Sequence, residues 1–136
     1  MIRAQLVRAL SDDLSSMKLE TLEAAPLVAG SVRVRLRAAS VNFPDILMIQ
    51  GKYQYKPELP FTPGMEGAGE IVECGSGVSG FSVGDKVVVG SKIGCFAEEI
   101  TSLLPVIYEG KYGDNTCFQL FTPTGNFLTL AGFIGC

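Results

Sequence analysis

The chain of 136 residues contains no histidine and no tryptophan. Without histidine the chain can form no Ser-His-Asp triad, no Cys-His pair and no histidine-ligated zinc site. No apolar run approaches the roughly 18 residues that a membrane-spanning helix needs. These absences exclude a large part of hydrolase and metalloenzyme chemistry, and they argue against a membrane span.

Cysteine is present, but not in the spacing of a metal or redox motif. The four cysteines are Cys74, Cys95, Cys117 and Cys136, and no C-x-x-C pair occurs. The sequence therefore predicts neither a zinc knuckle nor a dithiol redox site. Free thiols are typical of a reducing compartment, so we expect a cytoplasmic location.

The charge is low and unevenly distributed. Lys and Arg number 11 against 14 Asp and Glu, and charged residues make up 18% of the chain against 47% hydrophobic residues. Residues 1–58 carry 8 basic and 6 acidic side chains, whereas residues 59–136 carry 3 and 8. This pattern indicates a folded domain, and it lacks the clustered basic surface of a nucleic-acid-binding protein.

The clearest periodic signal is Ser31–Ala38, where apolar residues alternate with three arginines, Arg33, Arg35 and Arg37. A period of two predicts a half-buried strand. The arginines suggest either a phosphate site or the solvated face of an antiparallel sheet.

The rest of the chain up to residue 105 reads as short strands and tight turns with one short helix. Asn42 and Asp45 suit the start of that helix, and Gly51 suits its end. The prolines that follow predict an extended loop. The predicted strands are the opening segment, a region around Met17–Leu22, Gly69–Cys74, Val83–Gly90 and Phe96–Ile100.

Residues 106–136 predict a different architecture. Val106–Tyr108 and Phe127–Ala131 read as strands, and Cys117–Phe121 as one or two helical turns. Strand, helix and strand in that order is typical of an α/β domain.

Gly75-Ser-Gly77-Val-Ser-Gly80 matches the G-x-G-x-x-G pattern of dinucleotide-binding folds, and Glu98 follows about 20 residues later. That pattern binds a pyrophosphate only when a helix starts at the glycines. Gly84-Asp85 and a β-branched run follow instead, so we predict a loop between strands.

A family resemblance covers residues 1–105. Four blocks carry it in order: Ala39–Asp45, Gly51–Tyr53, Leu59–Gly69 and Val83–Val87. The chain resembles the N-terminal GroES-like half of a medium-chain dehydrogenase/reductase, most closely the zinc-free NADPH:quinone oxidoreductase (zeta-crystallin-like) branch. The fold that this implies is mainly β, a partly open GroES-like barrel.

The resemblance also implies that catalytic zinc is absent. The Gly-His-Glu motif of the zinc alcohol dehydrogenases is similar to Gly64-Met65-Glu66 here, and Asn42 stands where those enzymes have a cysteine. A thioether and an amide are poor ligands for Zn²⁺. Such zinc-free enzymes are expected to pass hydride directly from NADPH to a quinone or an enone.

The tail resembles a distant part of the same family, a late strand-helix-strand of the cofactor domain. We therefore predict a barrel domain over 1–105 and, over 106–136, a short α/β remnant of the Rossmann-type nucleotide-binding domain. The core of that domain, with its glycine fingerprint, is expected to be deleted, and much of the homodimer interface to be missing.

For the site, the resemblance implies that Asn42 faces the nicotinamide amide and that Tyr53 lines the same cleft. Gly132 and Phe133 would close it from the tail. Each has a plainer interpretation: Asn42 as a helix cap, Tyr53 and Phe133 as packing residues. Two functions stay open, an NADPH-dependent quinone or enone reductase that is inactive as this chain alone, and a non-catalytic GroES-like interaction module.

Overall fold

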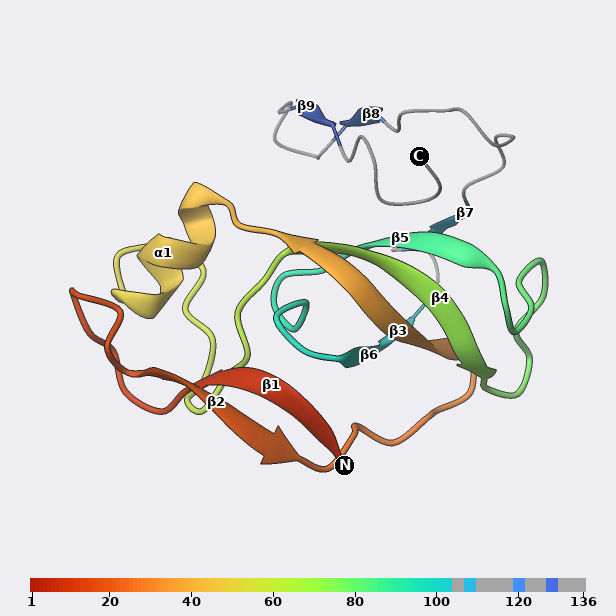
Figure 1. Cartoon of the computed structure of the whole chain (residues 1–136), viewed down its shortest axis with the longest axis horizontal. Helices are drawn as coiled ribbons and strands as arrows, with labels where there is room; N and C mark the ends of the chain where they lie inside the picture. Colours follow the sequence, from red (N-terminus) through yellow and green to blue (C-terminus); the bar gives the residue numbers. More distant parts are fainter. Residues whose placement is uncertain (104–106, 110–118, 122–126, 130–136) are drawn as a thin grey trace.

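The computed structural model describes residues 1–103, 107–109, 119–121 and 127–129. Strands dominate these residues, and Figure 1 shows the single short helix beside them. The elements are β1 (Ile2–Val7), β2 (Met17–Leu22), β3 (Ser31–Ser40), α1 (Phe43–Ile49), β4 (Glu66–Cys74), β5 (Lys86–Gly90), β6 (Glu99–Leu103), β7 (Ile107–Glu109), β8 (Gln119–Phe121) and β9 (Phe127–Thr129).

The main sheet has five antiparallel strands in the order β6-β3-β4-β5-β7, and β1 and β2 form a separate two-stranded sheet. The two sheets approach each other through isolated bridges, Ala4 with Ala97 and Val7 with Phe61. Within the described ranges the sheets stay open. The predicted mainly β, partly open barrel is therefore confirmed.

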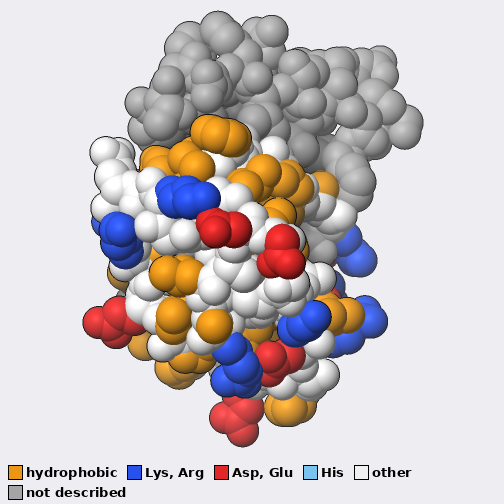
Figure 2. All heavy atoms as spheres, turned by 90° about the vertical axis from the view of Figure 1, so that its left-hand side faces the viewer, with side chains coloured by type: hydrophobic (Ala, Val, Ile, Leu, Met, Phe, Trp, Pro, Cys, Tyr) orange, Lys and Arg blue, Asp and Glu red, His pale blue; other side chains and the backbone are white. Residues whose placement is uncertain are grey.

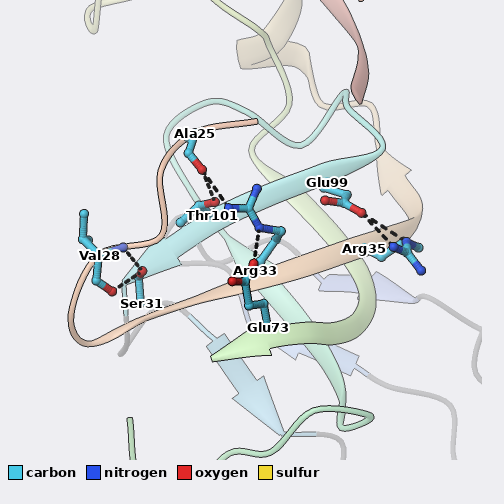
Figure 3. Close-up of polar contacts among 8 residues, drawn as sticks. All are labelled: Ala25, Val28, Ser31, Arg33, Arg35, Glu73, Glu99 and Thr101. Atoms are coloured by element: carbon cyan, nitrogen blue, oxygen red, sulfur yellow. Dashed lines mark hydrogen bonds and ion pairs between the residues drawn. The ribbon is translucent and has the colours of Figure 1, made fainter. Parts of the chain in front are cut away.

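Alternation along β3 produces one buried face and one polar face. Val32 and Val34 are fully buried, because the period-two pattern places them on the core side. On the other face the Arg33 Nε donates to Glu73 (3.0 Å), and the Arg35 guanidinium pairs with Glu99 (3.0 Å), as Figure 3 shows. Two of the three arginines are thus engaged within the sheet, which favours the structural interpretation over a phosphate site.

Two apolar clusters form the core. The first lies between β3, β4 and β5, and the second joins β1 to α1 and the loop before β4. Their buried members are Val32, Val34, Ile71, Val87, Val89 and Cys95 in the first, and Val7, Met48, Ile49 and Phe61 in the second.

α1 begins and ends where the sequence predicts. Asn42 is its N-cap residue and Gly51, with φ of 71°, follows the C-cap. The Gly51 N–H donates to Met48 O (3.1 Å) and the Lys52 N–H to Leu47 O (2.8 Å). This pair of bonds closes the helix with the left-handed turn that glycine adopts most easily.

Some strand boundaries differ from the prediction. β4 starts at Glu66 rather than Gly69, and β5 starts at Lys86 because Val83 lies in an exposed turn. The strand predicted over Phe96–Ile100 lies three residues later, as β6. The Phe96 carbonyl instead accepts a hydrogen bond from Gln5 of β1 (2.8 Å), which places this segment between the two sheets.

One prediction for the C-terminal segment is wrong. The helix predicted over Cys117–Phe121 is wrong for the described residues, since Gln119–Phe121 is a strand that pairs antiparallel with Phe127–Thr129. Only five residues separate the two strands, which suits a hairpin and is too short for a helical crossover. β7, from the segment assigned to the remnant domain, pairs with β5 and extends the main sheet.

Candidate functional site

The candidate site forms where β3 ends and β4 begins. Ser40 and Glu66 lie opposite each other in the antiparallel register of these strands, and Asn42 follows two residues after Ser40. The pairing of the strands therefore brings three polar side chains together from positions 24 to 26 residues apart along the chain. Figure 1 shows that the chain continues from the end of β3 into α1 at this point.

One carboxylate oxygen, Glu66 Oε2, accepts hydrogen bonds from both other side chains of this cluster. Glu66 Oε2 accepts a hydrogen bond from Asn42 Nδ2 (3.1 Å) and another from Ser40 Oγ (3.0 Å). Asn42 Nδ2 also donates to Ser40 Oγ (3.3 Å). The three side chains thus form a small closed network at the partly buried end of the sheet.

Asn42 stands at the N-cap of α1 in a capping-box arrangement with Asp45, although its own side chain makes no capping hydrogen bond. The bond that closes this arrangement runs the other way, since Asp45 Oδ2 accepts from the Asn42 N–H (2.8 Å). Its other oxygen, Oδ1, accepts from the Gly64 N–H (3.2 Å). Asp45 therefore ties the start of α1 to the segment that leads into β4.

Asp45 and Cys95 are the two buried titratable groups beside this network. Burial raises the pKa of the Asp45 carboxyl, and the negative charge of Glu66 adds to that rise against the opposing backbone hydrogen bonds. Burial also raises the pKa of the Cys95 thiol to about 12, with further contributions from Asp45 and Glu66. Cys95 is therefore a protonated, inert thiol behind the site.

Tyr53 lies at the opposite end of α1 from Asn42, and its backbone N–H donates to Leu47 O (3.2 Å). Its ring packs on the second core cluster, as Met65 does. Among the described side chains, Tyr53 and Asn42 share no hydrogen bond. Gly132 and Phe133 lie outside the described residues, so the four-residue cofactor site stays a prediction.

The glycine-rich segment is a loop between β4 and β5, as predicted. Gly77 and Gly80 have positive φ values of 77° and 81°, and the next regular element is the strand β5. The pattern therefore lacks the helix N-terminus that would bind a pyrophosphate.

Lys52, Lys56 and Lys92 offer no substitute for that helix end. Lys52 pairs with Asp12 (2.7 Å), Lys56 donates to the Gly51 carbonyl (2.9 Å), and Lys92 lies over the Tyr55 ring (4.9 Å). Figure 2 shows that the face on the α1 side mixes hydrophobic, basic and acidic side chains. No extended patch of one charge is visible there.

Comparison with known proteins decides the family. The sequence profile described as "Alcohol dehydrogenase GroES-like domain" matches residues 28–125, more than half of the chain. The chain belongs to this family. The match runs past residue 105, so the boundary between residues 105 and 106 stays a prediction.

Proteins similar to this GroES-like chain include quinone oxidoreductase-like proteins and solved quinone oxidoreductases, which agrees with the predicted resemblance to the medium-chain dehydrogenases/reductases. The human synaptic vesicle membrane protein VAT-1 homolog is 45% identical over 87 residues, 62% of this chain and 22% of that protein. The quinone oxidoreductase-like protein 2 homolog of Nematostella vectensis is 51% identical over 74 residues, 54% of this chain and 20% of that protein. A quinone oxidoreductase of Pseudomonas syringae superposes with a TM-score of 0.76 at 26% identity, over 87% of this chain and 35% of that one. The chain therefore spans about a fifth of the length of these curated relatives.

The GroES-like site offers a poor set of zinc donors. The family resemblance places Asn42 and Met65 at the zinc-ligand positions. The Asn42 amide is held by Glu66 and Ser40, and Met65 packs on the second core cluster. Both oxygens of Asp45 accept from backbone N–H groups. Across the described residues, no group of three or more His, Cys, Asp or Glu side chains is arranged to hold a metal ion. Nor does any helix in that part of the chain have the length and apolarity to cross a membrane.

Sequence reasoning named Asn42 but missed the network around it. From the sequence, Ser40 stands only in the family block Ala39–Asp45, beyond the predicted strand Ser31–Ala38. Asp45 is predicted only as a favourable charge at a helix start, and Cys95 only as a free thiol. The network depends on the register of β3 and β4, which places Ser40 opposite Glu66. That register shifts at two irregularities, so the alternating pattern of the sequence gives no signal for it.

Proposed function

We propose that this chain is the GroES-like part of a zinc-independent, NADPH-dependent quinone or enone reductase, and that it is inactive on its own. The observation that carries the proposal is the Asn42 side chain. Its Nδ2 group is held by Glu66 and Ser40 in place of a metal-ligating cysteine. In this arrangement the protein side of the site supplies position and hydrogen bonding rather than a Lewis acid.

The residues present fit only one end of the cofactor. A dinucleotide, when bound, supplies the hydride, and Asn42 and Tyr53 would orient the ring end against the acceptor. The described residues contain no helix N-terminus of the kind that binds the pyrophosphate. Gly132 and Phe133 would contribute further parts of a reductase site. The pyrophosphate site would come from a nucleotide-binding domain, and the longer relatives are large enough to include one.

Two further parts of the proposal concern zinc and location. The donor set of Asn42, Met65 and Glu66 argues against a catalytic zinc ion, so elemental analysis of purified protein should return well below one zinc per chain. One tightly bound zinc per chain would contradict this. The free thiols of Cys74 and Cys95 are consistent with a cytoplasmic location.

A non-catalytic interaction module is the second candidate. It is favoured by the G-x-G-x-x-G segment, which forms a loop between strands instead of a phosphate site. In that case the polar network at Asn42 serves to hold α1 against β4, and no cofactor or quinone binds there.

The test is a titration of the full chain with NADPH, followed by the fluorescence of the reduced nicotinamide, since the chain has no tryptophan. We expect no saturable binding below roughly 1 mM, because the phosphate-binding helix end supplies most of the affinity. A micromolar isotherm that is abolished by Asn42→Ala would contradict the expected loss of cofactor binding and would instead show a working half-site. A separate titration uses a quinone at millimolar concentration and follows the NMR signals of the Asn42 side chain. Unchanged signals would favour the interaction module.

A further inference from the structure

The network around Asn42 depends on a single acceptor atom. Glu66 Oε2 takes hydrogen bonds from two side chains, Ser40 at 3.0 Å and Asn42 at 3.1 Å. Ser40 in turn accepts from Asn42 at 3.3 Å. Removing the Glu66 carboxylate would therefore leave both donors without their shared partner.

A carboxylate also decides which way the carboxamide of Asn42 faces. An ionised carboxylate only accepts hydrogen bonds, so the amide must turn its NH₂ group towards Glu66. Hydrogen bonds to an ionised acceptor are stronger than bonds between neutral groups. The charge of Glu66 thus selects one of the two orientations that an isolated asparagine amide adopts with nearly equal ease.

The backbone of Asn42 is fixed by a different acid. Asp45 accepts from the Asn42 N–H (2.8 Å) and from the Gly64 N–H (3.2 Å). Asp45 therefore sets where residue 42 lies, and Glu66 sets how its side chain is turned. The two acids have separable roles, which makes the role of Glu66 testable without moving the backbone.

We propose that Glu66 is the positioning residue of this site, which orients the Asn42 carboxamide for a ligand. The inference rests on the proposed function, because the orientation matters to a reductase only if Asn42 contacts cofactor or substrate. If the side-chain amide must be immobilised when the ligand binds, the affinity for the ligand falls by roughly 2- to 12-fold. We expect a loss of that size when Glu66 no longer holds Asn42.

The experiment follows the side-chain NH₂ resonances of Asn42 by NMR in the full chain, assigned by their absence in Asn42→Ala. Glu66→Ala removes the acceptor, Glu66→Gln keeps a neutral oxygen acceptor, and Glu70→Ala on the same strand is the matched control. In the wild type we expect two separated resonances with slow hydrogen exchange. The exchange should become at least tenfold faster in Glu66→Ala, take an intermediate value in Glu66→Gln and stay unchanged in Glu70→Ala.

Backbone amide spectra of β3 and β4 show whether each variant is folded. If Glu66→Ala does not fold, the comparison of Glu66→Gln with the wild type decides, because that change keeps the size of the side chain. Unchanged Asn42 resonances in a folded Glu66 variant would overturn the inference.

A second measurement separates this inference from the proposed function. The quinone menadione is titrated into the wild type and the Glu66 variants, and the Asn42 resonances are followed. A response in the wild type that weakens several-fold in Glu66→Gln supports both ideas. No response in the wild type counts against the proposed function, while the exchange data still decide whether Glu66 positions Asn42.

Discussion

At the scale of single residues, Asp45 combines burial with a structural task. The residue is 1% exposed, and its carboxyl accepts from two backbone N–H groups on separate segments. A neutral apolar replacement would leave both N–H donors unpaired. The negative charge of Glu66 disfavours the ionised form of the Asp45 carboxyl. The residue therefore stabilises the site by hydrogen bonding while its ionisation is disfavoured.

We predict that Asp45→Asn lowers the free energy of unfolding by about 1–3 kcal/mol, because an amide offers one acceptor oxygen where the carboxylate offers two. The measurement is urea denaturation of both proteins. A loss below about 0.5 kcal/mol would mean that the two backbone bonds are not maintained in solution.

The same pair of proteins should show a pH dependence. The pKa of Asp45 is raised in the folded state above its usual value of 3.8. The folded protein then binds the proton more tightly than the unfolded chain does, so the associated stability is fully present below about pH 3.8 and is lost as the pH rises through the raised pKa. The stability difference between wild type and Asp45→Asn should therefore shrink from pH 4 to pH 8. A difference that grows over this range would show that the pKa is lowered.

Cys95 supplies a second prediction at this scale. Its pKa of about 12 lies well above the ordinary 9.0, so the thiolate fraction at pH 8 falls on the order of a thousandfold. Alkylation of Cys95 by iodoacetamide in native buffer, quantified by peptide mass spectrometry, should be slower than in urea by at least that factor. Equal rates would show that the first core cluster, to which Cys95 belongs, opens readily.

At the scale of elements, β3 and β4 carry the site, and their pairing is irregular. The register shifts between Leu36 and Ala38, opposite Gly69. A Cβ at Gly69 would lie 2.8 Å from the Arg35 carbonyl carbon and overlap the carbonyl itself. Glycine thus allows the close approach of the two backbones at this irregularity.

We predict that Gly69→Ala destabilises the protein by about 3 kcal/mol, the upper end of what overpacking typically costs, because the clash involves backbone that can move only by breaking the ladder. Gly90→Ala on the adjacent strand is the matched control, since a Cβ there meets nothing within 4 Å. Its cost should stay below about 1 kcal/mol in the same urea titration. Similar losses in the two variants would contradict the close approach.

Local signals account for most of the elements that the sequence predicted correctly. Both β3 and α1 were predictable, because their signals depend on short-range physics alone. For β3 the signal is the alternation in Ser31–Ala38. For α1 it is the helix-end residues Asn42, Asp45 and Gly51. The glycine motif was read correctly because Gly84-Asp85 prevents a helix. For Gln119–Phe121 the predicted helical turns are wrong, since this strand exists through pairing with Phe127–Thr129, which propensity does not report.

The site was less predictable than the fold for the same reason. Asn42 was found through a family resemblance, whereas Ser40 and Glu66 become partners only through the β3–β4 register. Asp45 looked like a favourable charge at a helix end, but its second bond reaches Gly64, 19 residues away. Such contacts depend on the tertiary arrangement, which single-sequence patterns do not fix.

At the scale of the whole molecule, the strands differ in how many neighbours hold them. β3 lies between β6 and β4, and β4 between β3 and β5, so both are hydrogen-bonded along two edges. β8 and β9 form a two-stranded sheet of three residue pairs. Two-stranded ladders of this length are marginal without further packing, and the five-stranded sheet is therefore expected to unfold last.

We predict that the backbone amides of Phe127–Thr129 exchange with deuterium at least tenfold faster than those of Ser31–Ser40 and Glu66–Cys74. Exchange from β9 requires the opening of one short ladder, whereas exchange from the centre of the main sheet requires disruption of strands paired on both edges. Time-resolved exchange with peptide mass spectrometry measures all three segments in one experiment. The edge strand β7 is the internal control, because Ile107–Glu109 pairs with β5 within the main sheet and should exchange more slowly than β9. Protection in Phe127–Thr129 equal to that of β3 and β4 would show that the hairpin belongs to the same cooperative unit as the GroES-like sheet. The tail would then not behave as the separate remnant that the sequence predicts.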